Sequence, residues 1–334
     1  KADKTELIGK AGTGEGAEVF NDYANNEAAK TYAHAEGFMT KAYGLHSHAE
    51  GSLTITGNPE VTTANSSGDY AHAEGYLTKA TGIQGCHVEG YETTSSGGST
   101  HAEGFRTTAS GMYGAHTEGR DSTASGDSAH AEGYGTQANG DNSHAEGYGS
   151  KAITDNAHAE GEYTNANGVG SHAEGAYTHA TGDSSHTEGY TTTASASCAH
   201  AEGWESIASG VSAHAEGYGT TAASESQHVQ GKYNIEDSDG VYAHIVGNGT
   251  SSTNRSNAHT LDWDGNAWYA GKVTVGADAE ELATKSDVHT ARPYVETTLP
   301  ATLSLNTIYD LGTQTSVTLK LPSANVGNFI QVDF

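Results

Sequence analysis

The chain has 334 residues, including 44 glycines, 19 histidines and only 4 prolines, and its 42 acidic and 15 basic residues give a net charge of −27. This charge argues against nucleic acid or an anionic membrane as a steady partner. Only 34% of the residues are hydrophobic, which is too few for the core of a large globular enzyme, so we expect an all-β repeat protein with a thin core and no enzymatic activity.

Residues 1–33 precede the regular part of the sequence and are predicted to form an N-terminal linker and cap. Residues 1–16 have a linker-like composition, and Phe20 and Tyr23 are the candidates to cover the first coil, because an exposed β edge must be protected. The chain opens at Lys1 and stops inside a strand-like run at 328–334. We therefore expect it to be a piece of a longer protein.

A unit of the form His-small-Glu-Gly recurs fifteen times between residues 34 and 250. From His116 to His228 the step is always 14 residues, whereas the step from His48 to His72 is 24 residues, which predicts a loop around 57–67. Gly at +3 from the histidine is present in every copy. The His and Glu positions are His34, Glu36, His48, Glu50, His72, Glu74, His87, Glu89, His101, Glu103, His116, Glu118, His130, Glu132, His144, Glu146, His158, Glu160, His172, Glu174, His186, Glu188, His200, Glu202, His214, Glu216, His228 and His244.

This period predicts a parallel β-solenoid. Glycine every few residues is unfavourable in a helix, while 14 residues with two glycine-marked corners suit two short strands and two turns, which form one coil. Strand alternation puts the histidine and the glutamate on one face and the small residues at −1 and +1 on the other, which must point inward. Fifteen coils that each advance about 4.8 Å make a rod of roughly 70 Å. An interior this narrow buries little apolar area, so we expect oligomerisation.

Three further positions of the unit invite an interpretation. Aromatic residues at +4 are expected to pack over a corner or against another chain, but they could also form a stripe that stacks on sugars: Tyr76, Tyr91, Phe105, Tyr134, Tyr148, Tyr190, Trp204 and Tyr218. The Thr or Ser at +6 is similar to flat ice-binding arrays, but we expect it to bond within the roll. Cys86 and Cys198 are too few for a disulfide framework and are predicted to be small filling residues.

Beyond residue 250 the period breaks. Residues 251–276 gather the apolar side chains that the roll lacks, and we expect a neck that joins the chains. Residues 277–290 contain a stretch, ADAEELATKSDV, that predicts a short helix and a coiled coil between chains. Residues 291–334 alternate like strands, at 303–311, 316–321 and 328–334, and predict a small β domain that is incomplete in this sequence.

The repeats resemble a known family. The units SHAEGYGSKA at 143–152 and AHAEGYGTTA at 213–222 are similar to the head repeats of trimeric autotransporter adhesins of the YadA type, which typically read SVAIG where this chain reads SHAEG. The HAEG form, with EVFNDYANN at 18–26 and NAHTLDWDGNAWYAG at 257–271, resembles repeat proteins of bacteriophage tails and fibres. The resemblance implies a left-handed parallel β-roll that assembles as a homotrimer, with His and Glu in place of an apolar seam between the chains.

We interpret the His and Glu positions as a structural ladder between subunits, in which each histidine donates to a glutamate of a neighbouring chain or coil. Three alternatives remain: a transition metal held by three histidines on the trimer axis, acid-base catalysis, and a solvated stripe outside the trimer. On the ladder interpretation we assign no cofactor, no metal and no catalytic residue. Protonated imidazoles in a row would repel one another, so assembly should weaken well below pH 5.

These features predict a structural trimeric fibre of a bacteriophage particle, from its tail or capsid, that serves as a rigid spacer and host-surface adhesin. Its partners would be two further copies, other virion proteins and a host cell-surface receptor that could be a glycan, and its location would be the virion. The alternative is the head of a bacterial trimeric adhesin on the cell surface. An enzyme would need a non-repeating polar pocket, which only 254–269 or the terminal β domain could supply.

Overall fold

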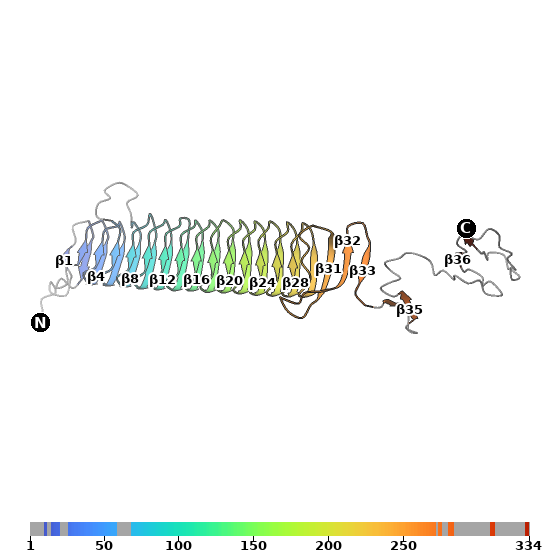
Figure 1. The fold of residues 1–334 in the computed structure, drawn as a ribbon. Coiled ribbons are helices and arrows are strands. Elements are labelled where there is room, and N and C mark those ends of the chain that lie inside the picture. The colour runs from blue at the N-terminus through green and yellow to red at the C-terminus, as the bar shows by residue number, and fades with distance from the viewer. Residues whose placement is uncertain are drawn as a thin grey trace. The chain divides into compact units, whose positions relative to one another are not determined.

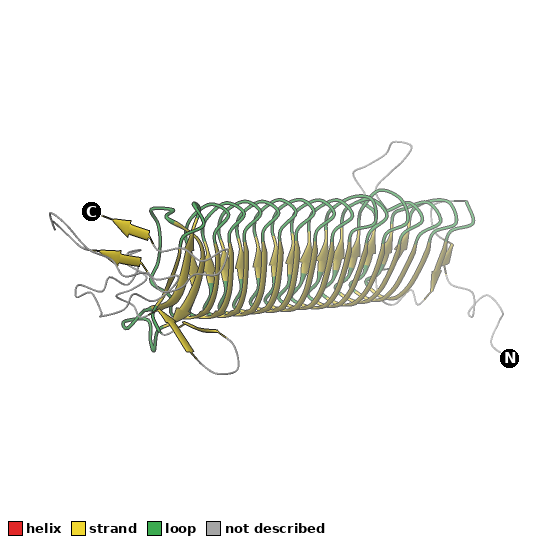
Figure 2. Cartoon of the chain, turned by 90° about the vertical axis from the view of Figure 1, so that its right-hand side faces the viewer, coloured by secondary structure: helices red, strands yellow, loops and turns green. Residues whose placement is uncertain are grey.

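The computed structural model describes residues 10–11, 15–20, 26–58, 68–271, 273–275, 280–283, 308–310 and 331–333. The chain divides into two units, residues 1–266 and 267–334. The first unit contains a parallel β-solenoid of about fifteen turns, in which successive coils lie side by side in chain order, as Figures 1 and 2 show. This confirms the predicted all-β repeat fold. The residues described contain no helix, and so none that could cross a membrane.

Each coil contributes a five-residue strand to one sheet and a two-residue strand to a second sheet. The five-residue strands are β4 (His34–Phe38), β6 (His48–Ser52), β8 (His72–Tyr76), β10 (His87–Tyr91), β12 (His101–Phe105), β14 (His116–Arg120), β16 (His130–Tyr134), β18 (His144–Tyr148), β20 (His158–Glu162), β22 (His172–Ala176), β24 (His186–Tyr190), β26 (His200–Trp204), β28 (His214–Tyr218) and β30 (His228–Lys232). All of them begin at the histidine of the unit.

The second sheet has fourteen strands and runs along the opposite side of the interior. Its strands are β3 (Glu27–Ala28), β5 (Lys41–Ala42), β7 (Ile55–Thr56), β9 (Lys79–Ala80), β11 (Thr94–Ser95), β13 (Thr108–Ala109), β15 (Thr123–Ala124), β17 (Gln137–Ala138), β19 (Lys151–Ala152), β21 (Asn165–Ala166), β23 (His179–Ala180), β25 (Thr193–Ala194), β27 (Ile207–Ala208) and β29 (Thr221–Ala222). From β5 on, each ends at position +8.

The register places every residue beside its counterpart in the next coil. In the β16–β18 pair, for example, His130 lies opposite His144 and Glu132 lies opposite Glu146. The register survives the 24-residue step, because His48 still pairs with His72. Residues 59–67, which make up most of the predicted loop, lie outside the described residues.

The interior is built from small side chains, as predicted. Positions −1, +1, +6 and +8 are fully or almost fully buried, for example Ala129, Ala131, Thr136 and Ala138. Position +6 is buried and does not form an exposed array. Serines there donate to the next coil, as Ser150 does to the Gly161 carbonyl at 2.9 Å. The expected bonding within the roll is wrong for seven threonines at this position, whose buried hydroxyls have no hydrogen-bond partner among the described residues: Thr40, Thr54, Thr78, Thr93, Thr136, Thr164 and Thr178. Of the two cysteines, Cys86 is buried, as expected of a filling residue, whereas Cys198 is exposed and that expectation was wrong for it.

The solenoid extends beyond the His-containing coils at both ends. Before them, β1 (Lys10–Ala11) pairs antiparallel with β2 (Glu18–Phe20), which pairs parallel with β4. Phe20 thus ends a strand in the coil that precedes the first unit, and Tyr23 lies outside the described residues. At the other end, β31 (Tyr242–Asn248), which contains His244 of the last unit, pairs parallel with β30 and antiparallel with β32 (Asn257–Asp262), which ends the parallel stack.

An aspartate ladder, to which the sequence analysis gave no role, supports one corner of the coil. Oδ1 of Asp127 accepts from the amide of Met112, Oδ1 of Asp141 from the amide of Asp127, and Oδ1 of Asp155 from the amide of Asp141, at 2.8–3.0 Å. Each aspartate therefore satisfies a turn amide of the preceding coil, which would otherwise lack a partner within the turn.

The second unit contains short strands. They are β33 (Ala267–Tyr269), β34 (Val273–Val275), β35 (Glu280–Ala283), β36 (Ile308–Asp310) and β37 (Gln331–Asp333). The helix predicted over 277–290 is wrong for Glu280–Ala283, because these residues pair antiparallel with β34, and this pairing overrides their helix propensity. β36 and β37 lie within two of the three predicted strand runs and pair parallel. The remainder of 277–290 and the run at 316–321 lie outside the described residues.

The close contact between coils leads to a prediction for Gly147, at position +3. Its φ is +105°, and a Cβ there would lie 2.2 Å from the carbonyl oxygen of Gly161 in the next coil. We expect Gly147→Ala to destabilise the roll by about 3 kcal/mol or more, because both the backbone conformation and the clash oppose the methyl group.

Gly135→Ala is the matched control. Gly135 also has a positive φ, but nothing lies within 4 Å of a Cβ there, and the equivalent residues Arg106 and Asp121 adopt the same conformation. Thermal unfolding followed by circular dichroism should show a much larger decrease in the stability of the roll for Gly147→Ala than for Gly135→Ala. Equal losses would contradict the role of the close contact.

Candidate functional site

The histidines of the repeat form one continuous column on the outer face of the first sheet. From His34 to His244 the imidazole rings of neighbouring coils lie 4.5–5.2 Å apart, centroid to centroid, and most are stacked. The column arises because the strands are in register and the side chain at position 0 points away from the interior. The structure thus brings together the predicted set of histidines.

The glutamates form a parallel row beside the column and are more exposed. In seven coils the Glu Oε2 lies 3.5–4.0 Å from Nε2 of the histidine in its own coil: His48–Glu50, His72–Glu74, His101–Glu103, His116–Glu118, His130–Glu132, His144–Glu146 and His158–Glu160. About half of each of these glutamate side chains is exposed, so the pairs within one chain contribute little to stability.

The column lowers the pKa of several of its histidines. Burial, and then the charge of the two neighbouring histidines, lowers the pKa of His116, His144 and His172 below the usual 6.5. The same causes lower the pKa of His48 and His200. At pH 7 these five imidazoles are therefore neutral.

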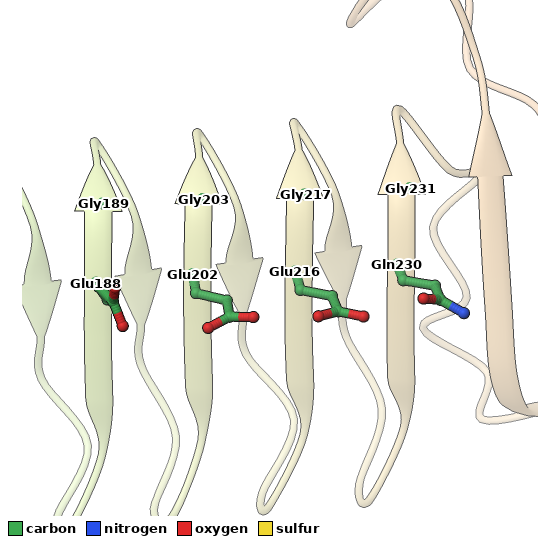
Figure 3. A pocket seen from close by; sticks show the side chains of 8 residues that line it. All are labelled: Glu188, Gly189, Glu202, Gly203, Glu216, Gly217, Gln230 and Gly231. Atoms are coloured by element: carbon green, nitrogen blue, oxygen red, sulfur yellow. The ribbon is translucent and has the colours of Figure 1, made fainter.

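The C-terminal end of the ladder differs from the rest. Here the glutamate reaches the histidine of the next coil: Glu202 Oε1 lies 3.9 Å from His214 Nε2, and Glu216 Oε1 lies 3.5 Å from His228 Nε2. In Figure 3 the carboxylates of Glu202 and Glu216 extend along the row, toward the coil of Gln230. Both side chains are about one third exposed, less than the glutamates of the middle coils.

A shallow groove of about 390 Å³ runs over this end of the glutamate row. It is lined by Glu188, Gly189, Glu202, Gly203, Glu216, Gly217, Gln230 and Gly231 (Figure 3). Burial, and then the contact with the carboxyl group of Glu216, raises the pKa of Glu202. Two groups of residues here could hold a metal ion, His200 with Glu202 and His214, and His214 with Glu216 and His228.

A second, aromatic column follows the +4 and +5 positions. It joins Tyr76, Tyr91, Phe105, Tyr134, Tyr148, Tyr163, Tyr177, Tyr190, Trp204, Tyr218 and Tyr233, with the Arg120 guanidinium 5.3 Å from the Phe105 ring centre and 5.2 Å from that of Tyr134. All the predicted aromatic residues belong to it. Most are about 40% exposed.

Sequence reasoning missed Tyr163 and Tyr177, although the repeat contains the signal that would have found them. They occupy +5 in two coils where +4 is Glu162 and Ala176, so the column continues without a gap. Where neighbouring rings are parallel, as Tyr134 and Tyr148 are at 5.0 Å, each ring face is covered by its neighbour. Such rings offer a partner their edges and hydroxyl groups more than their faces.

Comparison with known proteins adds no assignment. No protein-family model matches the chain, and no curated protein matches it. The resemblance to adhesin and fibre repeats therefore depends on the HAEG units and their flanks, and the structure supports its coarser part, a parallel β-solenoid with periodic histidines.

The lowered histidine pKa values predict that the roll loses stability in mild acid. A histidine whose pKa lies below 6.5 in the folded chain takes up its proton first in the unfolded chain, so its contribution is complete above about pH 6.5 and decreases below that value. We expect the melting midpoint to fall by about 5 °C or more between pH 7.5 and pH 5.5. The double variant His116→Asn/His144→Asn should show a smaller fall. A midpoint that is the same at both pH values would contradict this account.

Proposed function

We propose that this chain is the stiff shaft of a homotrimeric fibre on a bacteriophage particle, a left-handed roll that acts as a rigid spacer and as an adhesin for the host surface. The observation that carries the proposal is the unbroken register of the coils from β4 to β31. Every coil makes the same backbone hydrogen bonds to the next, so bending would have to break several bonds at once. A uniform, stiff solenoid is suited to holding a binding site at a distance.

Two features of the single chain support assembly with further copies. Its buried interior consists mostly of alanine, serine and threonine, while large apolar side chains such as Trp204, Tyr218 and Val211 are 43–48% exposed. The histidine column and glutamate row also run parallel along one face, so a second copy could offer its glutamates to the histidines of the first. Charged and polar rows of this kind set the register and identity of partners.

The phage assignment draws on the resemblance of the HAEG units and of 18–26 and 257–271 to tail and fibre proteins. The partners would be other virion proteins at one end and a host cell-surface receptor at the other. For a glycan receptor, the aromatic column offers hydroxyl groups and ring edges, and its T-shaped pairs, such as Tyr148 with Tyr163 at 84°, leave part of a ring face open. The head of a bacterial surface adhesin remains the alternative on the same repeats.

Mass and shape test the proposal together. Light scattering of the purified chain should give about three times the 34.4 kDa of one chain, and electron microscopy should show rods of roughly 70 Å with additional density at the ends. Gold-labelled antibodies should bind particles released from the organism that encodes the chain. A monomer at micromolar concentration would contradict the trimer, and labelling of the cell envelope instead of particles would favour the bacterial adhesin.

A charge reversal tests whether the ladder face is the seam. Glu132→Lys places a cation beside the histidine column in the middle of the glutamate row and should weaken assembly about tenfold or more. Glu225→Lys makes the same change at an exposed position away from the row and is the control. Sedimentation over a concentration series measures both variants. If they dissociate equally, the ladder does not form the interface.

A further inference from the structure

We propose that the C-terminal end of the ladder is a divalent transition-metal site within one chain, built from His200, Glu202 and His214 or from His214, Glu216 and His228. This inference does not depend on the fibre proposal. It also differs from an axial site between three chains, because every ligand comes from neighbouring coils of the same chain.

The ligand atoms are already gathered. Within each group they lie within 4.8 Å of one another. Glu202 lies between two histidines, with one carboxylate oxygen 3.8 Å from His200 Nε2 and the other 3.9 Å from His214 Nε2. Two ligands on a tetrahedral zinc ion, each about 2.1 Å from the metal, lie about 3.4 Å apart. Rotation of the glutamate side chain shortens its distances to the histidines, and the two stacked imidazoles, 4.5 Å apart, must tilt toward each other to share the ion.

The ring nitrogens are available to a metal. Nε2 of His200, His214 and His228 is shielded from solvent and has no hydrogen-bond partner among the described residues. A buried ring nitrogen without a hydrogen-bond partner is costly, and coordination of a metal would satisfy its lone pair. Nε2 of His200 and Nε2 of His214 each lie within 4 Å of a carboxylate oxygen of Glu202, so both nitrogens face the glutamate row. The two rings are parallel, 4.5 Å apart and at 3°, and a metal binds in the plane of an imidazole, so at least one ring must turn for both to hold the same ion.

The site is confined to these coils by the glutamate conformation. In seven coils before this end the glutamate lies near the histidine of its own coil, as Glu146 does near His144, whereas Glu202 and Glu216 reach the histidine of the next coil and come into contact with each other. Two adjacent carboxylates favour a cation between them. The acidic row ends at Gln230, and the groove over the row leaves room for water molecules to complete the coordination (Figure 3).

The chemistry of the ligands selects the metal. Two neutral imidazoles and a carboxylate suit Zn²⁺, Ni²⁺, Cu²⁺ or Co²⁺ better than Mg²⁺ or Ca²⁺, which prefer oxygen ligands. The two groups share His214, whose Nε2 can bind only one ion at a time. The two arrangements are therefore alternatives, and the expected stoichiometry is one ion per chain.

Cobalt titration of the full chain, prepared without a histidine tag, tests the site. Addition of Co²⁺ at pH 7.5 should produce visible d–d absorption that saturates at one ion per chain, with a Kd below about 100 µM, and an equal amount of Zn²⁺ should abolish it. His214→Asn should weaken binding at least tenfold, because it removes the shared ligand. His144→Asn, the same change in the middle of the ladder, should leave binding unchanged.

A second pair of variants tests the site even if His214→Asn fails to fold. Glu202→Gln/Glu216→Gln keeps the shape and the histidine stack but removes the negative charge, whereas Glu132→Gln/Glu146→Gln does the same in the middle coils. The first pair should lose cobalt binding and the second should keep it, with unchanged circular dichroism in both. No uptake by the unaltered chain, several ions per chain, or equal losses at the two places would each overturn the proposal.

Discussion

The close approach of successive coils at the +3 glycine is the constraint on which the rest of the structure depends. At Gly147 the carbonyl of the next coil occupies the place where a Cβ would be, so adjacent strands follow the same path with almost no offset. Every side chain therefore lies beside its counterpart. Histidine lies on histidine, glutamate beside glutamate, and one aromatic ring against the next, so a single backbone contact creates all three columns.

Stacking of like residues has opposite energetic consequences in the different columns. Stacking stabilises aromatic rings and buried alanines, whereas it brings like charges together, and their repulsion destabilises the roll. In the histidine column, burial and the neighbouring rings lower the pKa of His116, His144 and His172, which favours the neutral form of these imidazoles and avoids that repulsion. The glutamate row accounts for 13 of the 42 acidic residues. Neighbouring chains or a bound cation can compensate such a row, and these are the two proposals made for the ladder.

The repeat sequence predicted the solenoid, the inward small face and the outward His and Glu, because these follow from a 14-residue period and strand alternation. It did not predict features that depend on side-chain geometry between coils. The role of Asp127 requires knowledge of which turn amide lies one coil away, and the turn of Glu202 toward His214 depends on a rotamer. The helix expected over 277–290 failed at Glu280–Ala283 because pairing with Val273–Val275 outweighed local propensity. Assembly lies beyond a single chain and remains a proposal.

Hydrogen exchange along the solenoid tests the stacking most directly. From His34 to His214 the amide of each ladder histidine donates to a carbonyl of the next coil, as His130 does to Ser143 at 2.9 Å and His144 does to Ala157 at 2.9 Å. If all coils are held by the same in-register bonds, mass spectrometry should find strong and similar protection from β4 to β30, with faster exchange only toward the ends. Rapid exchange in the middle coils, around β16 and β18, would contradict the account.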